Sequence, residues 1–476
     1  MTKAFLSRPG PVPQLDEARV ADWLARSTDV RAAMSPPSPL SMDATRSGLA
    51  ELGLPPGSAV ILCLSNSVHM VQVYLASLLL GLVPLALPPA TPSARVRGIA
   101  QRLRARAVVT TRTEPERYGS RRARPVGRGT QAVLLDGDGP SPYSAGDVLM
   151  PTSGTSGMFS ACLHRLDSLL LNARRHAASV DMTASDVVLV SLPLHYSYAM
   201  VAQVLAAYVR GARLVVSGPP FSPVSYAAAV SGHAVTHSSI TPTLVRQVLA
   251  SLDSLPPHLR TLTVGGDQLG TRDVEALLRL RAGGELYLTY GLTEAGPRVS
   301  TLAAHAEPPR RHASVGLPLP GVRPRLRTPV DADGSGELLI ASDTALIDHV
   351  GDTDDGRRRG LVRPGVIATG DVFRIDEDGY LYFQGRLSDF VVVRGEKVSL
   401  RTLRQVAHTI PGVVHCDPRL AVDDDGSTVL DVHITATDTG RETERHIRRA
   451  LNSMLLLAER PRAIHVHAAD PTAFRK

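Results

Sequence analysis

The sequence predicts an α/β fold followed by a small α+β segment, and three features of the hydrophobic pattern support this. From about Met42, short apolar runs of strand type alternate with stretches of helix length, which is typical of parallel sheets built from βαβ units. After about Pro308, short runs separated by Gly, Pro and Asp indicate a small antiparallel unit. After Gly385, about 90 residues follow the order strand, helix, strand, strand, helix.

The elements of the α/β part follow from their lengths and from the residues that end them. An amphipathic pattern that starts at Met42 stops near Gly53, and a second one stops at Gly81. Short apolar runs of strand length lie between such patterns. Helices are expected over 42–53, 67–81, 95–107, 162–178, 200–211 and 243–252. Strands are expected over 58–65, 82–87, 107–111, 147–150, 186–194, 212–218 and 259–266.

The composition argues against several classes of protein. The formal net charge is +7, but the basic residues are scattered and no basic run is interleaved with aromatics, so we expect no nucleic-acid partner. The first residues lack the apolar core of a signal peptide, and the longest apolar stretch, 74–90, contains Pro84 and is too short to cross a bilayer. We therefore expect no membrane partner. Three widely spaced cysteines form no metal or disulfide pattern and suit a reducing cytoplasm: Cys63, Cys162 and Cys416.

The segment PTSGTSGMFSACLHR, residues 151–165, has the composition of a phosphate-binding loop. It lies between a predicted strand and a predicted helix, where backbone N–H groups and hydroxyls can face an anion. The residues concerned are Thr152, Ser153, Gly154, Thr155, Ser156 and Gly157. The loop lacks the lysine that follows the last glycine of a Walker motif. On these residues alone, a structural turn is an equal alternative.

Four later stretches carry further residue types of a nucleotide site. They are LTVGGDQLG at 262–270, LYLTYGLTEAG at 286–296, ATGDVFRIDEDGYLYFQGR at 368–386 and GRLSDFVVVRGEKVSL at 385–400. In order and spacing, the loop and these four stretches resemble the adenylate-forming superfamily of acyl-CoA synthetases, peptide-synthetase adenylation domains and luciferases. The resemblance covers roughly residues 40–476.

The resemblance implies a role for each motif. The loop would hold the leaving pyrophosphate of ATP, Tyr290 would lie on the adenine face, and Thr293 would bond the α-phosphate. Glu294 would hold Mg²⁺, which neutralises charge on the phosphates. Asp371 would accept hydrogen bonds from both ribose hydroxyls, Arg386 would contact the ribose edge, and His195 would lie beside the acid. Further residues assigned to the nucleotide are Gly265, Gly266, Asp267 and Gly291. A structural role is an equal alternative for His195.

The chain departs from the family pattern at the hinge and at two of the family's lysines. The loop continues with residues 158–161, MFSA, where the family has Pro-Lys-Gly after a variable residue. Ser388 stands at the hinge position, which is usually Asp or Lys, and Val392 stands where the family has a lysine. The first departure bears on how the loop holds the terminal phosphates. The others bear on the second half-reaction, in which the small domain rotates about the hinge.

Lysine is rare in this chain, so each one is informative. The chain has Lys3, Lys397 and Lys476 among its 52 basic residues. Lys397 lies in RGEKV, which resembles a family motif, and Lys476 follows Thr472 by four residues, as the family's catalytic lysine follows its Thr or Ser. The resemblance implies that Lys476 bridges the reacting carboxylate and the α-phosphate. A frayed terminal residue is the alternative.

The resemblance implies a large N-terminal α/β domain over 1–386, with two lobes and a small β unit, and a small mobile α+β domain over 387–476. The implied function is that of a cytoplasmic, AMP-forming acyl-CoA synthetase-like ligase. It would use ATP and Mg²⁺ to adenylate a small organic acid, such as an aryl carboxylic acid, in secondary metabolism. The acceptor of the activated acid is open between CoA, a carrier protein and an amine.

Two other functions remain as alternatives. Some members of the superfamily adenylate nitrite and deliver it to an aryl amine, and loss of features of the thiol half-reaction would suit such an enzyme. The second alternative is a degenerate relative that binds nucleotide without turnover. Retention of the nucleotide residues argues against it: Thr293, Glu294, Asp371, Arg386 and Lys476.

Overall fold

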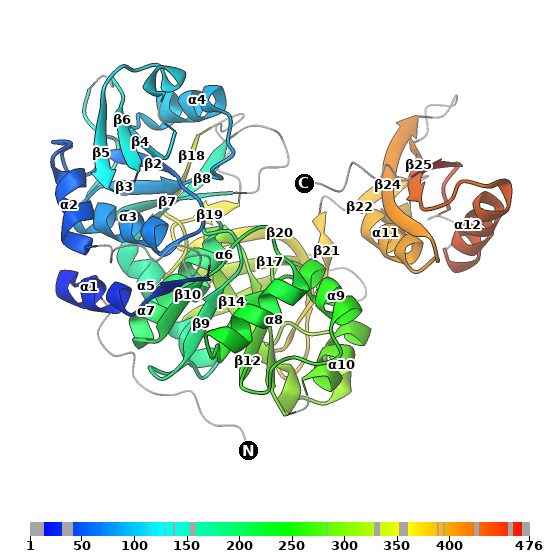
Figure 1. Cartoon of the computed structure of the whole chain (residues 1–476). Helices are drawn as coiled ribbons and strands as arrows, with labels where there is room; N and C mark the ends of the chain where they lie inside the picture. Colours follow the sequence, from blue (N-terminus) through cyan, green and yellow to red (C-terminus); the bar gives the residue numbers. More distant parts are fainter. Residues whose placement is uncertain are drawn as a thin grey trace. The chain divides into compact units, whose positions relative to one another are not determined.

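The computed structural model describes most of the chain (Figure 1). The described residues are 14–30, 41–112, 114–127, 129–136, 139–152, 159–281, 283–327, 334–351, 360–387, 390–393, 396–422, 428–455 and 460–468. No helix in these ranges is long and apolar enough to cross a membrane.

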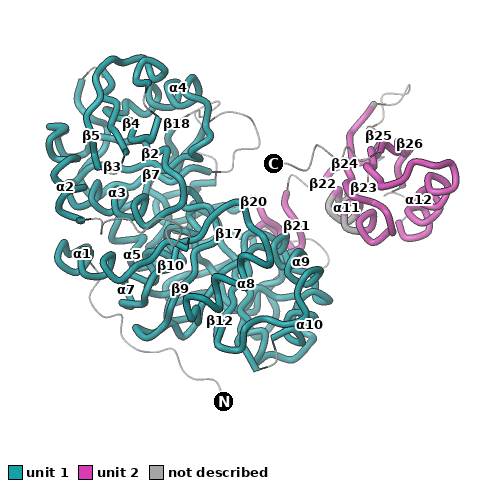
Figure 2. Tube along the Cα trace, viewed as in Figure 1, with its two compact units in different colours: residues 1–327, 338–369, 375–383 teal, residues 328–337, 370–374, 384–476 magenta. Residues whose placement is uncertain are grey.

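The chain divides into two compact units (Figure 2). Unit 1 comprises Met1–Arg327, Leu338–Thr369 and Ile375–Phe383, and unit 2 comprises Thr328–Glu337, Gly370–Arg374 and Gln384–Lys476. The predicted domain boundary between residues 386 and 387 stays a prediction.

The first sheet of unit 1 has the strand order β18-β8-β7-β3-β2-β4-β6-β5. Its strands are β2 (Ala59–Cys63), β3 (Val83–Ala86), β4 (Ala107–Thr110), β5 (Ala123–Gly127), β6 (Thr130–Leu134), β7 (Asp147–Pro151), β8 (Ser160–Arg165) and β18 (Asp348–Gly351). The central strands β7, β3, β2 and β4 are parallel. Helix α3 (Val68–Leu79) connects β2 to β3, and α4 (Ser93–Leu103) connects β3 to β4. This part of the sheet has the βαβ order that the sequence predicts.

The second sheet of unit 1 has the order β1-β10-β9-β11-β12-β13-β14-β15. Its strands are β1 (Thr28–Asp29), β9 (Val187–Val190), β10 (Arg213–Val216), β11 (His237–Ile240), β12 (Thr261–Gly265), β13 (Glu285–Gly291), β14 (Arg298–Ala303) and β15 (Leu317–Pro318). Strands β1, β10, β9, β11, β12 and β13 run parallel to one another, and β14 returns antiparallel to β13. The carboxyl ends of β9, β11, β12 and β13 therefore meet at one edge, which is where ligands bind in open α/β sheets.

The remaining helices of unit 1 flank and connect these strands (Figure 1). They are α1 (Glu17–Ala25), α2 (Met42–Ala50), α5 (Leu166–Ser179), α6 (Ser197–Ala199), α7 (Ala206–Arg210), α8 (Pro223–Gly232), α9 (Pro242–Ser251) and α10 (Thr271–Leu280). Where the sequence predicts one helix over 200–211, a π-helical segment, η3 (Met200–Leu205), precedes α7. Such segments are rare and occur often beside functional sites.

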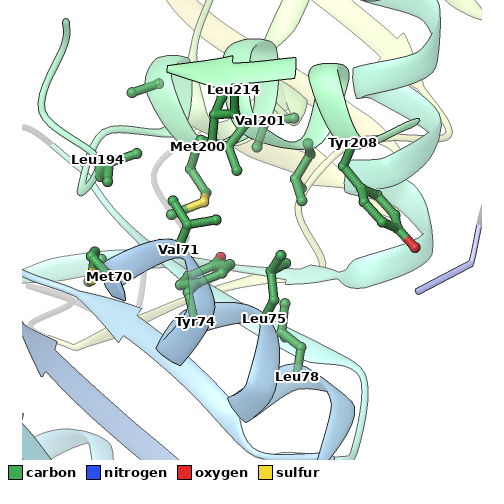
Figure 3. Close-up of a cluster of buried hydrophobic side chains, with 14 of the residues drawn as sticks. Met70, Val71, Tyr74, Leu75, Leu78, Leu194, Met200, Val201, Tyr208 and Leu214 are labelled. Carbon is green, nitrogen blue, oxygen red and sulfur yellow. The ribbon is translucent and has the colours of Figure 1, made fainter. Parts of the chain in front are cut away.

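A buried core joins the two lobes of unit 1 (Figure 3). Helix α3 begins where the Ser67 side chain accepts a hydrogen bond from the Met70 N–H, and nearly all of its residues are buried. Tyr74 and Leu75 of α3 belong to the same apolar cluster as Val201 of η3. Burial of each such side chain contributes about 1.5–3 kcal/mol to the fold.

The helix predicted over 162–178 is wrong in its first four residues. Residues 162–165 belong to β8, and α5 begins at Leu166. β8 pairs antiparallel with β7 on one side and with β18 on the other, so its backbone is extended. A short apolar run next to a helix has no periodicity of its own, and its pairing with residues 348–351 is not visible locally.

Further strands follow the two sheets of unit 1. The sheet β16-β17-β20-β19, with β21 on β20, corresponds to the predicted small β unit. Its strands are β16 (Val322–Leu326), β17 (Ser335–Ser342), β19 (Leu361–Arg363), β20 (Val366–Ile375) and β21 (Leu381–Arg386).

Unit 2 continues with an α+β arrangement. It contains β22 (Phe390–Val393), β23 (Glu396–Ser399), α11 (Leu400–His408), β24 (Val413–Val422), β25 (Thr428–Ala436), α12 (Arg441–Met454) and β26 (Ala463–Ala468). The predicted order of this segment lacked β23 and β26. Its core contains Leu403 of α11, Val432 of β25 and Ile447 of α12.

Candidate functional site

The carboxyl edge of the second sheet brings together most of the predicted site residues of unit 1 that the structure describes. Each follows or ends one of the parallel strands, although the residues come from parts of the sequence about 100 residues apart. Residues of this edge are His195, Ser197, Tyr198, Thr241, Gly265, Gly266, Tyr290, Gly291, Thr293 and Glu294. The edge is thus built from the segments that the motifs mark.

The glycines of this edge allow three chain segments to pack closely. A Cβ atom on Gly265 would lie 2.4 Å from Oγ1 of Thr289, and one on Gly291 would lie 2.2 Å from the carbonyl oxygen of Pro297. Gly266 has a φ of +92°, which favours glycine. Any other residue at Gly265 or Gly291 would push the strands apart.

The turn that follows β13 carries Thr293 and Glu294 and is held from four sides. The Thr293 and Ser197 hydroxyls lie 3.0 Å apart, and the Thr293 carbonyl lies 2.9 Å from Nε2 of His164. The carbonyl of Glu294 accepts from the N–H of Leu346 at 2.8 Å, and that of Ala295 accepts from the Thr344 hydroxyl at 2.8 Å. These bonds fix the backbone of the turn before any ligand binds.

His164 is a buried neutral imidazole that orients this turn. Because a carbonyl oxygen only accepts, Nε2 must carry the proton that it donates to Thr293. Burial lowers the pKa of His164 to about 4, so the ring is neutral at pH 7. Nδ1 has no hydrogen-bond partner among the described residues.

Asn172 of α5 ties the start of β14 to the same turn. Its Oδ1 accepts from the Arg298 N–H at 3.0 Å, and its Nδ2 donates to the Arg298 carbonyl at 2.9 Å. Nδ2 also lies 3.2 Å from the Thr344 hydroxyl, which bonds Ala295. One buried side chain therefore links α5, β14 and the turn.

The Arg298 guanidinium is a buried positive charge at this edge. The residue is 2% exposed, its Nη1 donates to the Thr289 hydroxyl at 2.7 Å, and its Cζ lies 4.1 Å from the centre of the Tyr198 ring. Burial lowers the pKa of Arg298, and its Nε has no hydrogen-bond partner in the described parts of the chain. No described carboxylate forms an ion pair with it. A buried charge without an opposite partner is costly to the fold.

Other predicted residues lie at or near the edge with separate contacts. His195 is half-buried, its ring centre lies 4.3 Å from that of Tyr196, and burial lowers the pKa of His195 to about 4. Asp267 is exposed, and its Oδ1 accepts from the N–H of Gln268 at 2.7 Å. Tyr290 is half-buried and pairs with Ser300 across β13 and β14.

The two predicted ribose ligands are neighbours in unit 2. Asp371 lies on β20 and is 5% exposed, whereas Arg386 ends β21 and is exposed. The Arg386 Nε lies 3.3 Å from the Asp371 carboxylate. This ion pair holds the Asp371 carboxylate in place.

Several predicted residues lie outside the described residues. These are Ser153, Gly154, Thr155, Ser156, Gly157, Ser388, Thr472 and Lys476. The first loop residue, Thr152, is described: its N–H and its hydroxyl both donate to the carbonyl of Ser160, at 3.0 and 3.1 Å.

Seven residues of the site are absent from the sequence prediction: His164, Asn172, Ser197, Tyr198, Thr241, Arg298 and Thr344. His164 and Asn172 are polar residues inside an apolar run, and this is the one local signal that could have marked them. Arg298 and Thr344 carry no such signal, because only the tertiary fold places them beside the turn.

Comparison with known proteins agrees with this geometry. Residues 42–346 match the family described as AMP-binding enzyme. A salicylyl-CoA synthase / salicylate adenylyltransferase of a Streptomyces species is 26% identical, over 85% of this chain and 80% of that protein. A long-chain-fatty-acid–CoA ligase of Mycobacterium tuberculosis is 26% identical, over 83% and 81%. A ligase of the same description from Thermus thermophilus is 31% identical, but that match spans 52% of this chain and 49% of the relative.

Solved structures share the fold. The o-succinylbenzoate coenzyme A synthetase of Bacillus subtilis, in complex with ATP and magnesium ion, has a TM-score of 0.75 and 19% identity, with 94% of this chain and 95% of that one covered. An anthranilate CoA ligase in complex with anthranoyl-AMP has a TM-score of 0.71 and 19% identity, with 90% and 87% covered. The predicted fold class is confirmed, and the predicted cofactors are those that the first of these structures holds.

Proposed function

Because this chain belongs to the family of AMP-binding enzymes, we propose that it is an AMP-forming ligase that activates a small organic acid with ATP. An oxygen of the acid attacks the α-phosphorus, the bond to pyrophosphate breaks, and an acyl-adenylate forms. The observation that carries the proposal is the rigid turn of Thr293 and Glu294, which lies at the sheet edge where ligands bind. A thiol or an amine then attacks the acyl carbon, loses its proton, and AMP leaves.

The turn contributes alignment and fixed donors. The Thr293 hydroxyl is positioned by Ser197 and its carbonyl by His164, so the hydroxyl can meet the α-phosphate without reorganising. Fixed donors of this kind stabilise charge that develops in the transition state and align the reacting groups. Here His164 is a positioning residue, because it acts through Thr293.

Glu294 fits the role of a magnesium ligand. Mg²⁺ takes oxygen ligands, keeps several waters and needs only one or two carboxylates beside the substrate phosphates. Glu294 offers one half-buried carboxylate next to the turn. When bound there, Mg²⁺ supplies positive charge that neutralises the phosphates.

The remaining nucleotide contacts are proposals from the motifs. The loop 152–157 would hold the pyrophosphate through backbone N–H groups and hydroxyls. Asp371, steadied by Arg386, would accept from the ribose hydroxyls. Lys476 would stabilise the charge on the reacting oxygens.

We propose that the acid is an aryl carboxylic acid. Three relatives or neighbours are named for salicylate, anthranilate and o-succinylbenzoate, all aryl acids. Arg298 supports an anionic substrate, since its buried charge gains a partner when an acid binds at this edge. Tyr198, whose ring lies against Arg298, offers an aromatic surface to such an acid.

Nitrite is the second candidate for the activated anion. Arg298 would attract a small inorganic anion as well as a carboxylate. The residues Ser388 and Val392 replace features of the thiol half-reaction, which a nitrite-adenylating enzyme does not need.

One assay separates these functions. The enzyme is incubated with ATP, Mg²⁺ and aryl or alkyl acids in the presence of hydroxylamine, and hydroxamate and pyrophosphate are measured. A parallel reaction contains nitrite and an aminoaryl acid, and the product mass is followed. Hydroxamate that forms in the absence of nitrite supports activation of a carboxylic acid. Pyrophosphate that appears only with nitrite shows that the carboxylate proposal is wrong, and pyrophosphate from neither shows that turnover is absent.

The role of Lys476 has its own test. Lys476→Ala should leave ATP binding nearly unchanged but lower pyrophosphate release by at least about 10²-fold, the scale of a lost charge stabiliser. Lys397→Ala is the matched control, because it removes another of the three lysines. Calorimetry measures ATP binding in each variant. Unchanged pyrophosphate release in Lys476→Ala would show that this residue is a terminal tail.

A further inference from the structure

Three metal-ligating side chains converge beside the Thr293 turn. They are Cys162 of β8, His349 of β18 and Glu294 of the turn itself. One ligand atom from each lies within 4.8 Å of the other two. The Sγ of Cys162 is 4.0 Å from Nδ1 of His349. All three residues belong to unit 1.

Backbone bonds hold the three ligands in place. Cys162 and His349 are directly opposite each other in the antiparallel pairing of β8 with β18. The residues just before β18 bond the backbone beside Cys162 and that of Glu294. The N–H of Ile347 donates to the carbonyl of Leu163 at 2.7 Å, and the N–H of Leu346 donates to the carbonyl of Glu294 at 2.8 Å. Only small side-chain movements are then needed to place the ligand atoms around one ion.

Cys162 is buried, and His349 has one buried nitrogen that the described residues do not satisfy. Cys162 has no exposed surface. Nε2 of His349 is buried and has no hydrogen-bond partner in the described ranges. Buried polar atoms of native proteins normally have a partner, so the protein alone does not satisfy the imidazole whose other nitrogen, Nδ1, faces the Cys162 thiol.

The chemistry of these donors differs from that of a magnesium site. Mg²⁺ prefers oxygen ligands, whereas a thiolate, an imidazole and a carboxylate suit zinc and similar ions. Three protein ligands leave a fourth tetrahedral position open, as in catalytic zinc sites. Glu294 alone fits magnesium, but the set of three fits a thiophilic ion better.

We propose that Cys162, Glu294 and His349 form a binding site for a thiophilic divalent metal ion such as Zn²⁺. On binding, the Cys162 thiol releases its proton to solvent and the thiolate, imidazole and carboxylate coordinate the ion. This site goes beyond the proposed ligase activity. Only one consequence rests on that activity: Zn²⁺ competes with ATP·Mg²⁺ for Glu294 and inhibits adenylation.

Cobalt tests the site directly, because Co²⁺ replaces Zn²⁺ and reports its ligands by colour. The full chain is stripped with a chelator and titrated with Co²⁺. We expect one ion per chain, a thiolate-to-cobalt charge-transfer band and the visible bands of a tetrahedral ion. Cys162→Ser should remove the charge-transfer band, and His349→Gln should weaken Co²⁺ binding by at least about 10²-fold, since loss of even an outer partner costs 10–100-fold.

Cys63→Ser is the matched control for the cobalt experiment. Cys63 is a buried cysteine on β2 of the same sheet, and its replacement should leave the band unchanged. Thermal unfolding followed by Trp23 fluorescence, from the single tryptophan of the chain, checks that each variant folds. Absence of a charge-transfer band in the folded wild type, or its persistence in folded Cys162→Ser, overturns the proposal.

Competition is measured separately by ATP calorimetry with Mg²⁺, with and without Zn²⁺. We expect at least about tenfold weaker ATP binding with Zn²⁺ in the wild type and little change in Cys162→Ser. Equal ATP affinity in both conditions contradicts the competition. If ATP does not bind at all while the cobalt band is present, the ligase proposal fails and the metal site stands.

Discussion

Arg298 and Arg281 are both buried, but their guanidinium groups meet different surroundings. Arg281 donates to the carbonyls of Leu259, Arg260 and Glu285, which satisfy it within the fold. Arg298 donates to one hydroxyl and lies against the Tyr198 ring. Arg281 therefore has a structural environment, whereas Arg298 has donors left over for an anion.

The first prediction is that Arg298→Met lowers kcat/KM for the acid by about 10²-fold, because a charged hydrogen bond in a buried site is lost. ATP binding should change less than kcat/KM, since the predicted ATP ligands Thr293 and Glu294 are held by Ser197, His164 and Leu346 and not by the Arg298 guanidinium. Arg281→Met is the control: it should lower stability but leave the KM for the acid near that of the wild type. Steady-state pyrophosphate release measures both. An unaltered kcat/KM in Arg298→Met contradicts a role in acid binding.

At the residue scale, the sequence indicates some site residues much better than others. Gly265 and Thr293 lie in motifs whose order is informative, and the structure brings both to one edge. His164 and Arg298 could not be found this way. Their importance comes from burial and from contacts with Thr293 and Tyr198, and these contacts depend on how α5, β13 and β14 pack.

At the scale of elements, α5 links β8 of the first sheet to the edge. It begins directly after β8, and its Asn172 bonds both backbone groups of Arg298. The local sequence could not separate β8 from α5, since both are apolar and contiguous. The alternation of β2, α3, β3 and α4 was predictable, because Gly53 and Gly81 mark the ends of helices.

The second prediction concerns this link. Asn172→Ala removes two hydrogen bonds to Arg298 and one to Thr344, and leaves buried backbone groups unpaired. We expect a loss of about 2–4 kcal/mol in the free energy of unfolding, together with lower adenylation, because the turn is no longer held. Urea unfolding followed by Trp23 fluorescence measures the first effect.

The matched control for Asn172→Ala is Ser168→Ala. Ser168 lies in the first turn of the same helix and bonds the Arg165 carbonyl in an exposed position. Its replacement should change the free energy of unfolding by less than about 0.5 kcal/mol. If Asn172→Ala is equally mild, then Asn172 does not hold β14 and the turn together.

At the scale of the whole molecule, unit 1 encloses histidines that are neutral at pH 7. His164 and His237 are both fully buried, and burial lowers the pKa of each to about 4. His237 opens β11 in the middle of the second sheet, and neither ring nitrogen has a hydrogen-bond partner among the described residues. The sequence could not show this, because burial depends on the neighbouring strands β9 and β12.

These histidines make the stability of unit 1 sensitive to acid. The charges that act on His237 are those of Asp186, which raises its pKa, and of Arg260 and Arg281, which lower it, but burial is the largest cause. The folded-state pKa is therefore below the usual 6.5. Between pH 6.5 and about 4 the unfolded chain binds a proton that the folded chain excludes, so stability falls as the pH falls through this window. Above pH 6.5 both states are neutral at His237 and the effect vanishes.

The third prediction is that His237→Leu reduces the acid sensitivity of unit 1. A leucine has similar volume and suits a buried strand position where the imidazole makes no hydrogen bond. At pH 7.5 the variant should be about as stable as the wild type. At pH 4.5 it should be more stable than the wild type by on the order of 2–3 kcal/mol, because a leucine binds no proton in the unfolded state. Urea unfolding followed by Trp23 fluorescence at both pH values measures this, because Trp23 is buried in unit 1. An equal loss of stability between the two pH values in both proteins would show that His237 can accept a proton in the folded state.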